Sequence, residues 1–198
     1  MNLVDLVPLA VILVLLTSLG LLITRSWRWI IVGLAAQYVG AFWLTSLHWP
    51  LGLAVVKVIA GWMAGVILGV AMVGSPTAWK SESRFWPSGR VFRLLTAVLV
   101  LLVVFAIAPR LETWWPGIQK EQLWGGLILA VMGLLHLGLT AQPLRVAVGL
   151  LTLLSGFEVI YASVETSTLV ASLLAVVNLG IALAGAYLIS APGLEEPA

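Results

Sequence analysis

The sequence predicts an all-α integral membrane protein with about seven transmembrane helices. Hydrophobic residues make up 62% of the 198 residues, charged residues only 9%, and the mean hydropathy is +1.13. Soluble globular domains carry about 25% charged residues, so this composition excludes a water-soluble fold. At about 20 residues per transmembrane helix, the chain has room for about seven helices in one membrane domain.

Seven apolar runs, each bounded by charged residues, proline or tryptophan, give the expected helices in order. The first contains Asp5 and has no basic segment before it, so we interpret it as a membrane span and not as a cleaved signal peptide. The polar segment 74–93 is expected to be a loop with a short amphipathic surface stretch. The predicted spans are residues 4–23, 29–47, 51–73, 91–109, 123–140, 146–163 and 168–190.

The basic residues are divided unevenly between the two sides of these spans. Arg110 and Lys120 fall on one side, and Lys57 lies within a span. The positive-inside rule therefore places the N-terminus outside and the C-terminus in the cytoplasm, and it explains the net charge of +2 without a nucleic-acid partner. The remaining basic residues, all on the predicted cytoplasmic side, are Arg25, Arg28, Lys80, Arg84, Arg90, Arg93 and Arg145.

An offset of 116 residues aligns the first three spans with the last three. It pairs Gly33 with Gly149 and Gly40 with Gly156, among other matches. We therefore predict two parallel three-helix repeats, joined by an extra helix and related by an axis along the membrane normal. The predicted division is residues 1–73 for the first repeat, 74–122 for the loop, the linking helix and an outer loop, and 123–198 for the second repeat and C-terminal tail.

Small residues recur at four-residue spacing on the third span, at Gly61, Gly65 and Gly69. Such a face lets a neighbouring backbone approach closely, which favours helix packing in lipid. Packing within the bundle is favoured over contact with another subunit.

Five polar side chains lie within the predicted spans and are the candidates for a proton path. A carboxylate there costs roughly 2.5–3.5 kcal/mol to insert, so Glu158 points to a function, with a neutral hydrogen-bonded structural role as the alternative. It is expected about 5 Å outward of the midplane. The five candidates are Gln37, Lys57, His136, Glu158 and Asn178.

Each of the other four has a competing interpretation. Asn178 is favoured as an interhelical hydrogen-bonding group. Lys57 is favoured as a side chain that extends to the membrane interface, with an ion pair to Glu158 as the alternative. His136 is favoured as a packing residue over a proton relay, and Gln37 carries the weakest signal.

No motif for a nucleotide, a metal or a catalytic nucleophile is present, and cysteine is absent. The two histidines, His48 and His136, are expected near opposite membrane faces, which argues against a shared haem. We therefore expect no cofactor and no electron transfer in this chain.

The segment GLLTLLSGFEVIYAS, residues 149–163, resembles the second helix of the K subunit of bacterial NADH-quinone oxidoreductase (complex I). The C subunit of multisubunit sodium/proton antiporters and related membrane-bound hydrogenases contain the same three-helix unit. Arg145, in the expected preceding loop, and the topology of the last three spans are also similar. The resemblance covers residues 123–190, and residues 4–73 through the internal repeat.

The resemblance implies a membrane-arm subunit that takes part in proton translocation beside larger antiporter-like subunits in a bacterial inner membrane. Glu158 matches the glutamate of the family's second helix. Asn178 falls where a third-helix glutamate is expected, and Phe42 aligns with Glu158 in the first repeat. Two other functions stay open: a structural protein that only packs against partners, and a stand-alone transporter of small solutes.

Overall fold

The computed structural model describes residues 7–75 and 89–191, and within these ranges the chain forms helices and short connections without strands. This confirms the predicted all-α class. The helices are α1 (Val7–Ile23), α2 (Trp27–Thr45), α3 (Leu51–Gly74), α4 (Arg90–Trp114), α5 (Lys120–Gly138), α6 (Pro143–Tyr161) and α7 (Thr168–Ser190).

The helices have the length and composition of membrane spans. Five of them, α3 to α7, are long and apolar enough to cross a bilayer, and α1 is a shorter apolar helix of 17 residues. The chain is thus a multi-pass membrane protein.

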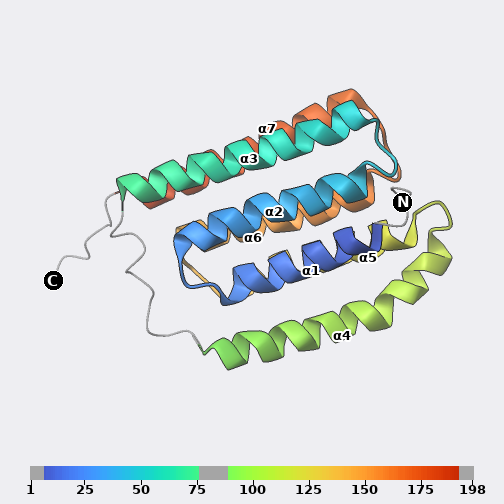
Figure 1. The fold of residues 1–198 in the computed structure, drawn as a ribbon, viewed down its shortest axis with the longest axis horizontal. Coiled ribbons are helices and arrows are strands. Elements are labelled where there is room, and N and C mark those ends of the chain that lie inside the picture. The colour runs from blue at the N-terminus through green and yellow to red at the C-terminus, as the bar shows by residue number, and fades with distance from the viewer. Residues whose placement is uncertain (1–6, 76–88, 192–198) are drawn as a thin grey trace.

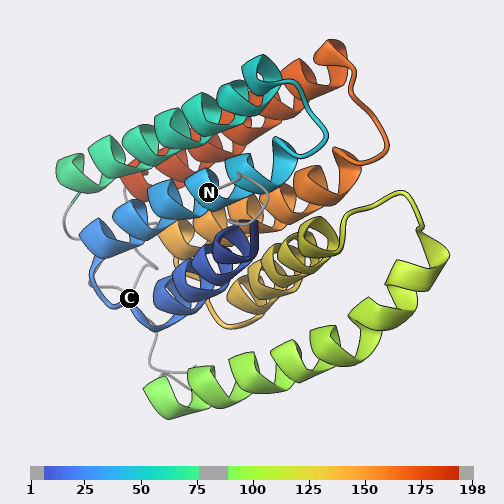
Figure 2. The same cartoon turned by 45° about the vertical axis from the view of Figure 1, so that its right-hand side comes forward.

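The helices form two layers, α1–α2–α3 and α5–α6–α7 (Figure 1). Across the layers α1 lies beside α5, α2 beside α6 and α3 beside α7, while α4 packs outside against α5 and α1 (Figure 2). Each facing pair runs in the same direction (Figure 1). This arrangement places each predicted repeat helix beside its counterpart, although the repeat itself stays a prediction.

The facing order of the helices does not fit a twofold axis between the two layers. Such a twofold axis would place α1 beside α7 and would bring counterpart residues to the same interface. Instead, Lys57 is 5% exposed whereas its counterpart at the 116-residue offset, Leu173, is 58% exposed. Asn178 is likewise 2% exposed and its counterpart Trp62 50% exposed. The facing order therefore excludes a twofold axis, while the predicted axis along the membrane normal stays a prediction.

The largest difference from a predicted helix boundary lies at the end of α4. Helix α4 continues past Pro109 to Trp114, where the sequence analysis ended the span, and its ribbon bends toward that end (Figure 1). Proline removes one backbone N–H and its ring clashes with a preceding carbonyl, so a helix that continues through it bends. Helix α4 also begins at Arg90, inside the segment predicted as a loop.

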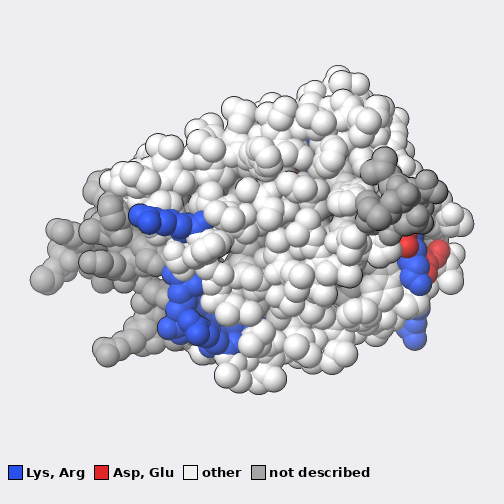
Figure 3. Space-filling model, in the orientation of Figure 1, with Lys and Arg blue, Asp and Glu red and all other residues white. Residues whose placement is uncertain are grey.

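Charged side chains gather at the two ends of the bundle (Figure 3). We call the end at which α2, α4 and α6 begin the basic end, and the other the opposite end. The basic end carries Arg25, Arg28, Arg90, Arg93 and Arg145, whereas the opposite end carries Arg110, Glu112, Lys120, Glu121 and Glu165. Asp5, Lys80, Arg84, Glu195 and Glu196 lie outside the described residues.

Two arginines at the basic end bind the C-terminal end of α1. Arg93 of α4 donates to the Leu22 carbonyl at 3.2 Å, and Arg145 of α6 donates to the Thr24 carbonyl at 2.6 Å. Cations are favourable there because the last carbonyls of a helix carry partial negative charge. Arg145 was expected in a loop, but it lies inside α6 and is 1% exposed. The two arginines thus fix α1 to α4 and α6.

The predicted glycine face of α3 is used unevenly. A Cβ at Gly61 would meet the ring of Tyr38, one at Gly65 would meet Ile31 at 3.7 Å, and one at Gly69 would meet nothing within 4 Å. A closer approach that the sequence analysis did not single out joins α5 and α6. A Cβ at Gly133 or Gly156 would collide with the partner helix's backbone. Helices α5 and α6 are therefore in direct backbone contact.

Candidate functional site

The polar centre of the bundle is an ion pair between Lys57 of α3 and Glu158 of α6. The two side chains are each 3% exposed, and their residues are 101 positions apart in the sequence. Glu158 lies six residues past Thr152, the middle of α6, which is about 9 Å from the helix midpoint. This distance exceeds the expected 5 Å because α6 spans Pro143–Tyr161, so its midpoint lies earlier than that of the predicted span 146–163. The pair joins the two layers.

Lys57 does not extend to the membrane interface, so the interpretation favoured from the sequence is wrong. Its ammonium contacts the Glu158 carboxylate, lies 3.5 Å from the Ser155 hydroxyl and sits 5.3 Å from the centre of the Tyr38 ring. An opposite charge attracts far more strongly in a medium of low dielectric constant than in water. The aromatic face adds a cation–π contact. Lys57 therefore turns inward to its counter-charge.

Asn178 and Tyr38 complete the site around the carboxylate. The Asn178 amide donates to Glu158 Oε1 at 2.7 Å, and the Tyr38 hydroxyl donates to Asn178 Oδ1 at 2.6 Å. Ser155 also forms a hydrogen bond with the Tyr38 hydroxyl. Both carboxylate oxygens thus have partners, one charged and one neutral. Such a fully hydrogen-bonded arrangement is what allows ionised groups to remain inside a membrane.

A second group of polar side chains lies closer to the basic end. Gln37 of α2 donates to the Ser18 hydroxyl of α1 at 2.8 Å and accepts a hydrogen bond from the Thr152 hydroxyl of α6 at 3.0 Å. All three are buried. Thr152 lies one helical turn from Ser155, so the second group begins where the ion-pair site ends.

His136 lies farther toward the basic end and does not touch the ion pair. It is 2% exposed, packs against Gly149 and forms a hydrogen bond with the backbone of Leu21. The structure therefore brings three of the five predicted polar residues together, Lys57, Glu158 and Asn178. Gln37 and His136 lie apart from them, nearer to the basic end.

Four polar residues of these two groups were missed by the sequence analysis. Ser155 and Thr152 precede Glu158 by three and six residues, a spacing that places them near one face of α6 and could have revealed them. Tyr38 and Ser18 carry no comparable signal, because one hydroxyl in an apolar run does not indicate its partner.

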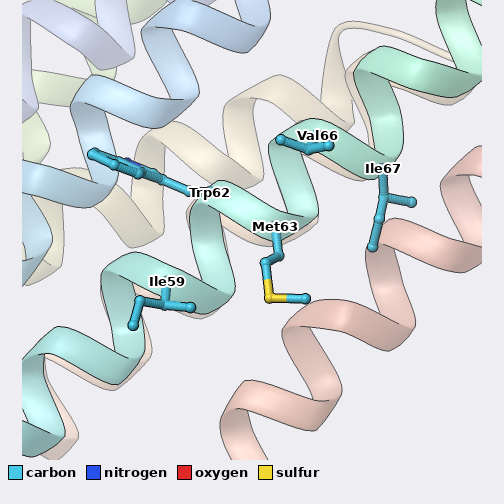
Figure 4. A pocket seen from close by; sticks show the side chains of 5 residues that line it. All are labelled: Ile59, Trp62, Met63, Val66 and Ile67. Carbon is cyan, nitrogen blue, oxygen red and sulfur yellow. The ribbon is translucent and has the colours of Figure 1, made fainter.

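The described surface also contains a shallow apolar hollow on the outer side of α3 (Figure 4). Its volume is about 340 Å³, and it is lined by Ile59, Trp62, Met63, Val66 and Ile67. Exposed apolar side chains are what lipid contacts on a membrane protein, so the hollow needs no ligand to explain it.

Comparison of the chain with protein-family models, with curated proteins and with solved structures gives no match.

Proposed function

We propose that this chain is a membrane-arm subunit of a complex I-like or multisubunit cation/proton antiporter-like assembly, and that it contributes to proton translocation through Glu158. The observation that carries the proposal is the buried Lys57–Glu158 pair between the two layers. Ionisable groups inside a membrane are costly, and their usual use is in proton or ion pathways. The resemblance of residues 149–163 to the K subunit adds support.

The chemistry that the pair can perform is uptake and release of one proton. A proton that binds the Glu158 carboxylate neutralises it and leaves the Lys57 ammonium without a counter-charge. Burial disfavours such an uncompensated ammonium, so either Lys57 gives up a proton or Glu158 releases the one it received. Asn178 and Tyr38 hold the carboxylate in place during this exchange. The site thus favours a short-lived protonated state over permanent proton storage.

In this proposal the protein lies in a bacterial inner membrane with its basic end in the cytoplasm. The unequal distribution of arginines supports that orientation. Larger antiporter-like subunits are the partners that the resemblance implies, and they would supply the remainder of the proton path.

The proposal is tested with Glu158→Gln, which keeps the size of the side chain and removes its charge. Native membrane vesicles should show weaker proton pumping by the assembly, while the chain still copurifies with its partners in mild detergent. Glu165→Gln, in the loop at the opposite end, is the control and should pump normally. Normal pumping with Glu158→Gln would refute the proposal.

A second candidate, a structural subunit without transport, is favoured by the position of the pair across the two layers. An ion pair that joins α3 to α6 would hold the halves together whether or not it exchanges protons. This alternative predicts that Glu158→Gln leaves pumping unchanged and that a bulky residue at Gly61 disrupts assembly.

A further inference from the structure

The two sides of the ion pair differ in chemistry. Toward the opposite end, three apolar residues lie one or two helical turns from Lys57, Glu158 and Asn178. Leu53 is four residues from Lys57, Ala162 four from Glu158 and Ala171 seven from Asn178, so each lies on the same helix face as its polar neighbour. These three residues pack with Trp49 in one buried cluster, which we call the apolar seal (Trp49, Leu53, Ala162 and Ala171).

The seal is fixed in place at its outer edge. The Trp49 indole N–H donates to the Glu165 carbonyl in the α6–α7 connection at 2.8 Å, and the side chain is 5% exposed. The indole therefore spans from the connection between α2 and α3 to the one between α6 and α7, over the opposite end of the site.

The other side of the pair is polar. Ser155 contacts the Lys57 ammonium, and Thr152, Gln37 and Ser18 follow in the direction of the basic end. We call these four side chains the polar row (Ser155, Thr152, Gln37 and Ser18). Hydroxyl and amide groups can each donate and accept hydrogen bonds, so such a row can also hold water molecules between its members.

Two further polar side chains, His136 and Arg145, lie between the polar row and the basic end. Ser18 lies one helical turn from Leu21, whose backbone binds His136. His136 packs against Gly149, which is one turn from Arg145. A neutral imidazole has one donor and one acceptor nitrogen, so His136 can extend the hydrogen-bonding groups toward the basic end.

We infer that the Lys57–Glu158 pair exchanges protons only with the basic end, along the polar row, and that the apolar seal closes the route from the opposite end. This inference rests on the proposed function, because it adds a direction to the proton exchange proposed there. It makes the chain one half of a route across the membrane, so the other half must lie in a partner or open when the seal moves.

Gln122 is a buried polar residue at the opposite end, but it belongs to a different contact. Its amide donates to the Val159 carbonyl at 2.7 Å, which ties α5 to α6. It therefore does not extend the polar row through the seal.

The test uses single cysteines, since the natural chain contains none. Ser155→Cys and Thr152→Cys place a thiol in the polar row, and Ala162→Cys places one in the seal. Leu150→Cys, partly exposed on α6, is the lipid-facing control. Vesicles of known orientation receive an anionic methanethiosulfonate reagent that lipid excludes, and mass spectrometry of the full chain measures labelling.

Two exposed positions report which side the reagent reaches. Ser26→Cys marks the basic end and Gln119→Cys the opposite end. We expect both polar-row thiols to react from the Ser26 side about tenfold faster than from the Gln119 side, a ratio that equals about 1.4 kcal/mol in activation free energy. The Ala162 and Leu150 thiols should stay unlabelled from both sides. Adding Trp49→Ala to Ser155→Cys should open the second side.

Three results would overturn the inference: equal labelling from both sides, faster labelling from the Gln119 side, or no labelling of either polar-row thiol. None of them depends on proton pumping. If labelling is one-sided but Glu158→Gln pumps normally, the proposed function fails while the one-sided route stands.

Discussion

The first layer, α1–α3, and the second layer, α5–α7, differ most in what they place at matching positions. At the 116-residue offset Glu158 corresponds to Phe42, Lys57 to Leu173 and Asn178 to Trp62. Every polar member of these pairs faces the interface between the layers. Leu173 is 58% exposed and Trp62 is 50% exposed, so both face the lipid.

This difference follows from how the layers stack. Because α3 packs against its own counterpart α7, the face that α3 turns toward α7 corresponds to the outer face of α7. The polar site therefore occupies the one internal interface, and its counterparts on the outside must be apolar. The first layer also contributes to the site, since it supplies Lys57 and Tyr38.

The largest effect should come from removing one charge of the pair. Lys57→Met leaves Glu158 buried without its counter-charge, and we expect a loss of about 3–5 kcal/mol in the free energy of unfolding. Leu173→Met changes the matching position in the second layer and should change stability by less than about 0.5 kcal/mol. Denaturation in detergent micelles measures both. Equal losses of unfolding free energy from both variants would contradict the difference described between the two positions.

A smaller effect is expected where the layers pack against Tyr38. Gly61→Ala adds a methyl group inside the Tyr38 ring, which must shift and lose its bond to Asn178, at a cost of about 1–3 kcal/mol. Gly69→Ala, on the same helix, meets nothing within 4 Å and should be neutral or stabilising by up to about 1 kcal/mol. Denaturation in detergent micelles measures both variants. A Gly61→Ala protein as stable as the natural chain would contradict the packing described.

Removing the Asn178 amide should destabilise the protein less than Lys57→Met or Gly61→Ala. Asn178→Leu removes the hydrogen bond to Glu158, and side-chain hydrogen bonds between membrane helices contribute about 0.6–1.7 kcal/mol. The counterpart change, Trp62→Leu, affects a lipid-facing residue and should cost less than Asn178→Leu. A larger loss from Trp62→Leu would reverse the comparison.

The smallest effect is expected for Tyr38→Phe, which removes one hydroxyl and keeps the ring beside Lys57. We expect a loss of about 0.6 kcal/mol, the average for a hydrogen bond between membrane helices. Tyr187→Phe, on an exposed part of α7, is the control and should be silent. A silent Tyr38→Phe would mean that Asn178 holds the carboxylate alone.

The sequence predicted the helices well because hydrophobic length determines a membrane span. It ended the fourth span too early, at Pro109, and left Arg145 outside the sixth, because tertiary contacts decide whether a helix continues through a proline or buries an arginine. It could not pair Lys57 with Glu158. In helices that are apolar on nearly all sides, periodicity does not show which face meets a neighbour, and a lysine near a helix end equally suits the interface.

Lys57 and Glu158 should behave as one unit across the two layers in a double-mutant cycle of unfolding free energies. Lys57→Met and Glu158→Gln should each destabilise the protein, while the double variant should lose less than the sum by about 3 kcal/mol, because neither charge is then left unpaired. If the two losses simply add, the side chains do not interact and the account of the site is contradicted.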